Sequence, residues 1–495
     1  MPMRHIAARV SSWQSVAALI GAATIVTAGT DGPAAAAPSP AAAGDRAALL
    51  APVPPSLFTW GDEAVGELGN GVLGPTQLAT SFTGAADIAP SPAPVLLPAG
   101  VRQLVAYRDD GMALLSNGTV ATWGDNSTDQ IGDGSGNDRA TPVVLPGLTG
   151  ITQVAGGGAD EMALDSGGTV WVWGNNYSGE AGNDTHGGDI LTPQRVPGLS
   201  GVVQIAAGSS SDYALKSDGT VWAWGDNIYG ELGDDTTLNR LNPSQVRGLT
   251  GITKIAAGEE DAYAIRADGS VMAWGNNSHG LLGNGTDTGM STVPVQVPGL
   301  AGVTQISADY YDAFALAGPA GTVWYWGTNG DGSGSGDGTT SPHFTPVQTG
   351  LSSVSQLAVG DYNAIVVLSS GSVLTWGDNS FGELGIGTTD FHEHASPVLV
   401  NVLADASLVA VGEDDVMAVA SPAPRIPSVI DDTQAGAAQA LQAAGYVLGR
   451  VSTVIDITCD YVGVVKTQSP VAGTVDPPGT SVSVAIGKAG GKCLG

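Results

Sequence analysis

The sequence predicts an all-β protein built mainly as a seven-bladed β-propeller, with a small α+β domain at its C-terminal end. Two observations predict the propeller. The dipeptide Trp-Gly occurs in seven copies, and five of the six intervals between them measure 50 to 52 residues, a period typical of propeller blades. Glycine accounts for 73 of 495 residues, as expected for a chain with many tight turns. The seven tryptophans are Trp60, Trp123, Trp173, Trp224, Trp274, Trp326 and Trp376.

The repeat around Trp274 indicates why each copy should form one four-stranded blade. Three short runs of β-branched, apolar or aromatic residues are separated by polar turns, and the third run ends at Trp274. The turn 268–269 is Asp-Gly, a hairpin sequence, because glycine tolerates the positive φ angle that such turns require. A polar loop, 276–283, then leads to a fourth run at 293–297. Four strands in succession make one blade.

The two ends of the repeat array are incomplete in complementary ways. Trp60 lacks the first and second strands that should precede it, whereas 409–419 supplies two such strands with no Trp-Gly after them. We therefore expect the C-terminal strands to complete the first blade by pairing with the N-terminal strand. Closing the ring in this way removes exposed sheet edges. The propeller is assigned to residues 56–421.

The motifs of the repeats resemble those of the regulator-of-chromosome-condensation repeat propellers. The matching elements are Ala-Ala-Gly, Ala-Leu, Asp-Gly, Trp-Gly-x-Asn and Gly-Glu-Leu-Gly, which are clear at 205–233, 255–283 and 376–385. The resemblance implies a seven-bladed ring. The nuclear members of this family act in nucleotide exchange on an intracellular GTPase. The N-terminal segment of this chain has the pattern of an export signal, which argues against that role here.

At one position of the repeat, the family usually has histidine, whereas this chain has mostly aspartate. A ring of carboxylates can bind a cation in the channel. The alternative that we favour is structural, with each short side chain accepting a hydrogen bond from a nearby backbone N–H. The residues of this column are Asp110, Asp160, Ser211, Asp261, Asp312, Asn363 and Asp415.

The N-terminal segment 1–37 has the pattern of an export signal. Arg4 and Arg9 precede an apolar run at 16–26, and small residues at the end of the segment offer a cleavage site. The run is shorter than the roughly 20 residues that span a bilayer. Residues 38–55 are rich in Ala and Pro and are predicted to be a linker. We therefore expect a secreted protein without an integral membrane segment once the signal is removed.

Residues 425–488 resemble the PASTA module, which occurs outside the membrane on bacterial penicillin-binding proteins and kinases. An Ala-rich and Leu-rich helix at 433–445 is followed in order by Gln-Ser-Pro, Ala-Gly and Pro-Pro-Gly-Thr. In that family the module is associated with peptidoglycan fragments and β-lactams, although some copies are spacers. The resemblance implies a bacterial source and an association with the cell wall.

The two cysteines both lie near the C-terminal end. Cys459 belongs to the PASTA-like unit and Cys493 to the tail 489–495. In an exported chain, two thiols in one small unit most simply form one disulfide. Two unrelated free thiols are the alternative.

The net charge limits the kinds of partner. The chain has 47 Asp and Glu against 17 Lys and Arg, a formal net charge of −30. This excludes a nucleic-acid binder, because contacts to phosphates need a dense basic surface. The C-terminal unit is neutral, so the charge belongs to the propeller. We therefore expect a protein partner with a neutral or basic face.

The loop that follows each Ala-Ala-Gly varies most in chemistry between blades, and we predict a partner-binding surface there. Tyrosine is favoured at binding hot spots because it buries a large area at low entropic cost, so tyrosines on adjacent blades are expected to form one patch. Covering of blade edges is the alternative role. The predicted binding residues are Tyr310, Tyr311, Tyr362, Glu259 and Glu260, and the variable pairs are Arg108-Asp109, Ser209-Ser210, Glu259-Glu260, Tyr310-Tyr311, Asp361-Tyr362 and Glu413-Asp414.

No catalytic motif and no cofactor signature occur in the sequence. It contains no G-x-S-x-G element and no phosphate-binding loop. The leading hypothesis is an exported scaffold for protein–protein interaction, which the C-terminal unit places near peptidoglycan. Two alternatives remain, a secreted inhibitor of β-lactamase and a cell-wall polysaccharide lyase or hydrolase that uses paired carboxylates.

Overall fold

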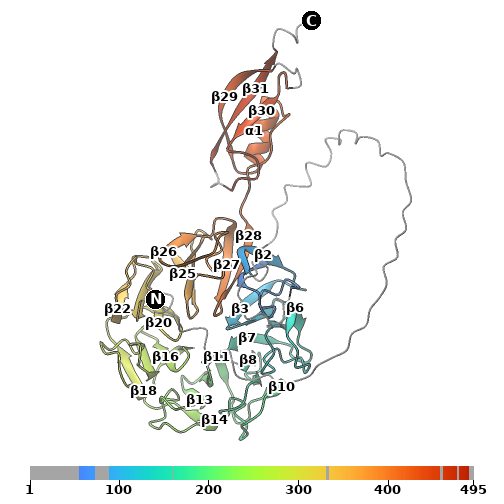
Figure 1. Ribbon diagram of the computed structural model, residues 1–495. Helices are drawn as coiled ribbons and strands as arrows, with labels where there is room; N and C mark the ends of the chain where they lie inside the picture. Colours follow the sequence, from blue (N-terminus) through green and yellow to red (C-terminus); the bar gives the residue numbers. More distant parts are fainter. Residues whose placement is uncertain are drawn as a thin grey trace, which may run out of the picture. The chain divides into compact units, whose positions relative to one another are not determined.

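The computed structural model describes residues 55–72, 88–158, 160–329, 334–456, 461–475 and 479–489. The predicted signal segment, most of the linker, and both Cys459 and Cys493 lie outside the described residues. Seven four-stranded antiparallel sheets stand around a ring, and a three-stranded sheet with one helix forms the C-terminal unit (Figure 1). The predicted all-β, seven-bladed fold is confirmed.

Blades 2 to 4 are each continuous in the sequence, with four strands in chain order. Blade 2 contains β3 (Val101–Tyr107), β4 (Asp110–Leu115), β5 (Val120–Gly124) and β6 (Arg139–Val144). Blade 3 contains β7 (Ile151–Gly156), β8 (Asp160–Asp165), β9 (Val170–Gly174) and β10 (Ile190–Arg195). Blade 4 contains β11 (Val202–Ala207), β12 (Ser211–Lys216), β13 (Val221–Gly225) and β14 (Arg240–Gln245).

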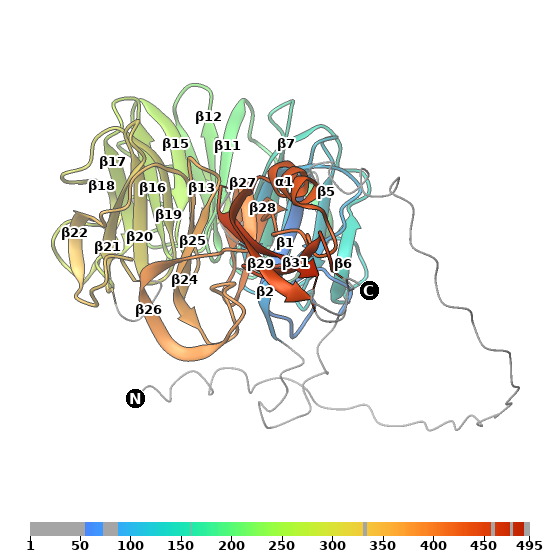
Figure 2. The ribbon, with the colours of Figure 1, turned by 90° about the horizontal axis from the view of Figure 1, so that it is seen from above.

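Blades 5 to 7 repeat this order, and Figure 2 shows the strands of several blades standing side by side, with neighbouring strands of a blade antiparallel. Blade 5 contains β15 (Ile252–Ala257), β16 (Asp261–Arg266), β17 (Val271–Asn276) and β18 (Met290–Val297). Blade 6 contains β19 (Val303–Ala308), β20 (Asp312–Ala317), β21 (Thr322–Gly327) and β22 (His343–Gln348). Blade 7 contains β23 (Val354–Val359), β24 (Asn363–Leu368), β25 (Val373–Asn379) and β26 (Asp390–Leu399).

Blade 1 closes the ring with strands from both ends of the repeat array. It contains β27 (Leu403–Val411), β28 (Asp415–Pro422), β1 (Ser56–Asp62) and β2 (Ile88–Val95). β1 pairs with β28 in antiparallel register, with Ser56 opposite Ala420 and Gly61 opposite Asp415. The closure predicted from the incomplete first and last repeats is therefore confirmed.

The first strand of every blade lies innermost, and in blades 2 to 4 a glutamine of this strand bonds to the first strand of the next blade. The Gln204 side chain of β11 donates from Nε2 to the Ile255 carbonyl, 2.8 Å, and accepts at Oε1 from the Ile255 N–H, 3.0 Å. Gln103 and Gln153 make the same pair of bonds to the following blade. These glutamines satisfy strand-edge groups that have no partner within their own sheet.

Each repeat tryptophan connects its blade to the loop of the preceding blade. All seven are fully buried. Trp274 Nε1 donates to the Glu231 carbonyl at 2.6 Å, and the other six indoles make equivalent bonds to the previous Gly-Glu-Leu-Gly loop or its counterpart. Gly233, at φ +61°, ends that loop against Trp274, and a Cβ there would lie 2.9 Å from the indole nitrogen. The two motifs thus recur together because they form one inter-blade contact.

The C-terminal unit has its own small core. The helix α1 (Gln434–Ala443) begins at Thr433, whose hydroxyl accepts from the Gly436 N–H. It accompanies a sheet of β29 (Val447–Asp456), β31 (Ser481–Ala489) and β30 (Val465–Ser469), in that order. Leu441, Tyr446 and Val482 are among its buried residues. Within the described ranges, no helix has both the length and the apolar character needed to cross a membrane.

Candidate partner-binding face

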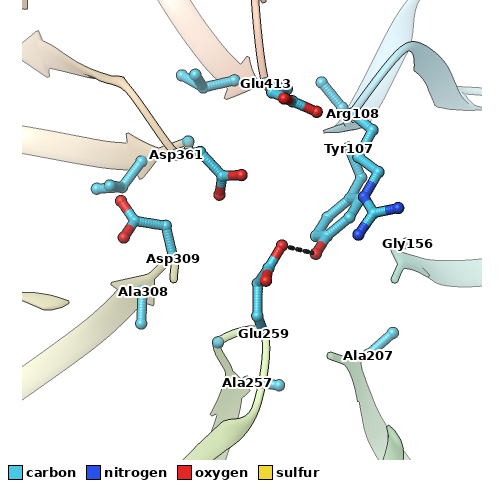
Figure 3. Close-up of a pocket in the computed structure, with 16 residues that line it drawn as sticks. Tyr107, Arg108, Gly156, Ala207, Ala257, Glu259, Ala308, Asp309, Asp361 and Glu413 are labelled. Carbon is cyan, nitrogen blue, oxygen red and sulfur yellow. Dashed lines mark hydrogen bonds between the residues drawn. The ribbon is translucent and has the colours of Figure 1, made fainter. Parts of the chain in front are cut away.

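The loops between the first and second strands of all seven blades meet at one end of the central channel. They meet there because every innermost strand ends at the same side of the ring, where the chain turns back into the second strand. A cavity of about 110 Å³ lies between them, and every blade contributes residues to its lining. Figure 3 shows this opening with Glu259, Asp361 and Glu413 around it, and with Tyr107 and Arg108 on another side.

Three carboxylates, which we call the acidic mouth, come from three blades. They are Glu259 of blade 5, Asp361 of blade 7 and Glu413 of blade 1, and all three line the cavity. Burial, together with the charges of Glu259 and Glu413, raises the pKa of Asp361 to about 7. The acidic mouth therefore carries more negative charge than its surroundings neutralise.

Arg108 is the one basic residue in the loops around the opening. It has a left-handed backbone conformation, φ +47°, which is uncommon for a residue with a side chain. Desolvation lowers the pKa of the guanidinium, but electrostatic interactions with the groups nearby, Tyr107 and Glu259 foremost, outweigh this and raise it above its usual value. Arg108 is therefore held charged beside the acidic mouth.

Tyr107 reaches across the channel. Its hydroxyl donates to Glu259 Oε1 at 2.9 Å, which joins blade 2 to blade 5. Tyr107 occupies the position that is glycine in most other blades, as at Gly258 and Gly412. A Cβ on either glycine would collide with the carboxylate of the aspartate three residues later. Sequence analysis missed Tyr107, although the replacement of this glycine by a large side chain is a visible signal.

The three predicted tyrosines lie together, and we call them and one histidine the tyrosine patch. The rings of Tyr310 and Tyr311 are 5.0 Å apart between centroids, and Tyr311 and Tyr362 are 6.4 Å apart. His279, from the long loop of blade 5, lies 5.0 Å from Tyr310 and 5.1 Å from Tyr311. All four side chains are partly exposed. Sequence analysis did not include His279, because its loop and the tyrosine loops belong to different repeats.

The predicted acidic residues of blade 5 lie beside this patch. Glu260 accepts from Asn276 Nδ2 at 2.6 Å, and burial raises the pKa of its carboxyl group. Burial and the charges of Glu260 and Glu259 raise the pKa of Tyr310. Asp309 and Asp361 line the cavity and directly precede Tyr310 and Tyr362, so the tyrosine patch and the acidic mouth are parts of one surface.

The aspartate column begins the second strand of each blade, and its members are buried. Asp312 accepts from a backbone N–H, that of Gly334 at 3.0 Å, but this donor lies 22 residues further along the chain and not in the turn next to Asp312. The expectation is wrong at Asp160, Asp261 and Asp415, whose carboxylate oxygens accept no hydrogen bond from a backbone N–H among the described residues. The N–H groups three residues earlier in the chain, those of Gly157, Gly258 and Gly412, donate instead to the backbone carbonyls of these aspartates.

The remaining metal candidate, Asp110, is also buried, and burial followed by the Asp125 charge raises its pKa. Burial likewise raises the pKa of Asp160, and raises that of Asp261 to about 8. These side chains are therefore favoured in their neutral form. In the described part of the chain, no three or more His, Cys, Asp or Glu side chains are grouped so that they could hold a metal ion.

Comparison with known proteins agrees with this architecture. A family model described as the RCC1-like domain matches residues 38–332 and 145–423. The chain is 30% identical over 324 residues to the ultraviolet-B receptor UVR8 of Arabidopsis thaliana, which covers 63% of this chain and 73% of the receptor. It is 28% identical over 290 residues to the E3 ubiquitin-protein ligase HERC2 of Homo sapiens, where the match covers 56% of this chain but only 5% of the ligase.

Solved structures show the same fold at lower sequence identity. Human WBSCR16 superposes with a TM-score of 0.64 at 23% identity, over 74% of this chain and 99% of that one. Prp20p of Saccharomyces cerevisiae gives a TM-score of 0.63 at 22% identity, over 75% of this chain and 93% of that one. At these identities the likeness concerns the fold alone.

Proposed function

This chain belongs to the RCC1-like domain family, and from that premise we propose that it is a protein-binding scaffold whose partner docks on the loop face at the channel opening. The observation that carries the proposal is the tyrosine patch, in which aromatic side chains from three blades lie in contact while partly exposed. Aromatic anchors of this kind dominate the energetics of protein interfaces.

The size of the cavity favours a macromolecular partner over a small substrate. Its volume of about 110 Å³ is below the roughly 300 Å³ at which ligand pockets begin. A lyase or hydrolase would have to hold several sugar units, which this opening is too small to enclose. A partner that covers the whole loop face needs no deep pocket.

One solved relative supports partner binding by analogy. The structure of Prp20p is reported together with the binding of that protein to Gsp1p and histones. We transfer only the general property, that a propeller of this fold binds other proteins, because the identity between the two chains is low.

Export and cell-wall association complete the proposal, and they rest on the sequence patterns at 1–37 and 425–488. Cell fractionation with N-terminal sequencing tests export, and a mature chain beginning close to residue 38 in the medium or cell wall is expected. Co-sedimentation of the whole chain with purified peptidoglycan tests the second part. A variant truncated after residue 424 should then stay in the supernatant.

Affinity capture tests the scaffold role. The wild type and the triple variant Y310A/Y311A/Y362A are used as baits on the secreted and wall fractions, with quantification by mass spectrometry. Tyr177→Ala is the matched control, because Tyr177 is 66% exposed on blade 3. A partner retained by the wild type and the control but lost from the triple variant is the expected result. A partner captured equally by all three baits would overturn the assignment of the face.

A further inference from the structure

The tyrosine patch and the acidic mouth are electrostatically continuous. Tyr362 follows Asp361 directly in the chain, and burial and the Glu413 charge raise the pKa of the Tyr362 hydroxyl. Burial and the charges of Glu260 and Glu259 likewise raise the pKa of the Tyr310 hydroxyl. A partner segment that covers the aromatic rings therefore also meets the carboxylates.

The negative charge of this surface exceeds its positive charge. Glu259, Asp361 and Glu413 line the cavity together with a single guanidinium, that of Arg108. Asp309 lines it too, with one carboxylate oxygen held by the N–H groups of Tyr311 and Asp312. An acidic or neutral partner would leave this excess charge uncompensated when the interface excludes water, at a cost in free energy.

We propose that the loop face docks a partner segment that carries Lys or Arg side chains, one of which places its cationic end in the acidic mouth while its stem lies on the tyrosine patch. This inference rests on the proposed function and specifies the chemistry of its partner. Charge complementarity and the adjoining aromatic rings point to the same occupant.

The chemistry of each part fits a long basic side chain. Aromatic faces attract cations and cover the aliphatic stem of Arg or Lys. Carboxylates at the end of that stem make charge-assisted hydrogen bonds, which are stronger than bonds between neutral groups. The cavity of about 110 Å³ is several times the roughly 10–15 Å³ that one water needs, so it can admit one guanidinium or ammonium group.

The protonation of Asp361 gives the interaction a pH signature. With its pKa near 7, this carboxyl group is partly protonated at neutral pH, and a cation binds the ionised form. Binding should therefore strengthen as the pH rises from 6 to 8 and should release protons. Contacts between uncharged groups would not follow this trend.

Labelled peptides test the inference directly. The probe is a twelve-residue Gly/Ser peptide with three Arg residues, and the matched peptides carry Lys, citrulline or Glu instead. By fluorescence anisotropy, the Arg and Lys peptides should bind the full chain at least about tenfold more tightly than the citrulline peptide. Their binding should weaken as salt is raised from 50 to 300 mM, because screening acts on exposed charges. Equal binding of the Arg and citrulline peptides, or no salt dependence, would overturn the inference.

Charge-removing variants locate the binding. The double variant Asp361→Asn with Glu413→Gln should lose about tenfold in affinity for the Arg peptide while its melting temperature stays unchanged or rises, since repulsion is relieved. Asp268→Asn is the control, because it removes one carboxylate from an exposed hairpin turn outside the loop face. Equal affinities of the double variant, the control and the wild type would overturn the inference.

The same variants separate this inference from the scaffold role. If a captured partner is lost from Y310A/Y311A/Y362A but retained by the charge-removing double variant, the face binds a partner that is not recognised by its basic residues, and only the inference fails. If neither variant changes capture, the proposed function fails as well. Loss from both, with Asp268→Asn unaffected, is the expected result.

Discussion

The hydroxyl of Tyr107 donates a hydrogen bond to Glu259 Oε1 at 2.9 Å and so connects blades 2 and 5 across the channel. Their residue numbers differ by 152, and no sheet pairing links the two blades. This bond couples opposite sides of the ring. It also orients one carboxylate of the acidic mouth.

Removing this hydroxyl should therefore cost stability. We expect Tyr107→Phe to lower the free energy of unfolding by about 1 kcal/mol, since hydrogen bonds to charged groups contribute about 1.5–3 kcal/mol and this one is partly exposed. Urea denaturation measures the change. Tyr177→Phe, at an exposed position, should stay within about 0.5 kcal/mol of the wild type. Equal effects of the two changes would show that the cross-channel bond contributes nothing.

Gly233 allows a clean test of the contact between blades 4 and 5. An added Cβ would lie 2.9 Å from Trp274 Nε1 and 2.8 Å from a methyl group of Val246. Gly248 has a similar backbone angle, φ +72° against +61°, but nothing within 4 Å of such a Cβ. Gly233→Ala should therefore destabilise the fold by about 1–3 kcal/mol more than Gly248→Ala, because both carry the backbone strain but only the first adds overpacking.

The difference between these two glycine variants is the quantity to measure, by denaturant unfolding under identical conditions. Equal losses would mean that Trp274 shifts without cost and that the loop contact is not a tight one.

The glutamines of the innermost strands should contribute more to the stability of the fold than those on the outer strands. Gln204→Leu removes the partners of both the N–H and the carbonyl of Ile255, and we expect a loss of about 2 kcal/mol because an unsatisfied buried group costs about 1–3 kcal/mol. Gln245→Leu, on the exposed face of β14, is the control. Thermal melting of both variants gives the comparison, and a Gln204 variant as stable as the control would contradict this role.

The seven-bladed ring could be predicted from the sequence because each blade carries the same short motifs within its own repeat. Each Trp-Gly copy marks the third strand of a blade, and the incomplete ends at Trp60 and 409–419 identify the closing blade. Since equivalent positions of adjacent repeats lie side by side, the approach of Tyr311 to Tyr362 was predictable too. The same logic does not extend to His279, which meets the tyrosines from the long loop of the preceding blade.

The cross-channel bond of Tyr107 and the protonation of the aspartate column could not be predicted from the sequence, because they depend on the dimensions of the folded ring. The reach of Tyr107 to Glu259 depends on the width of the channel. The protonation of the aspartate column depends on burial, because an interior position disfavours the charged form. For the same reason the formal charge of −30 overstates the negative charge of the folded propeller near neutral pH.

These buried carboxyl groups predict how stability depends on pH. Burial, as the largest cause, raises the pKa of Glu67, Asp261 and Glu383 to about 8 each, whereas the unfolded chain has values of about 4. Between these limits the folded state holds protons that the unfolded state has released. Their contribution to stability is therefore complete below about pH 4, is lost as the pH rises towards 8, and changes little above that. Melting temperatures measured from pH 5 to 9 should fall across this window.

The variant Asp261→Asn should make the decline between pH 5 and 8 shallower, because it removes one of the titrating groups while keeping the shape of the side chain. Asn363 occupies the equivalent position in blade 7 and is 1% exposed, so an amide is compatible with this site. Asp268→Asn serves as the control, since hydrogen bonds from Ser270 lower the pKa of Asp268 and its titration lies below the window. If both variants keep the wild-type slope, Asp261 is ionised in the folded protein and its burial must be compensated by bound water or a counter-ion.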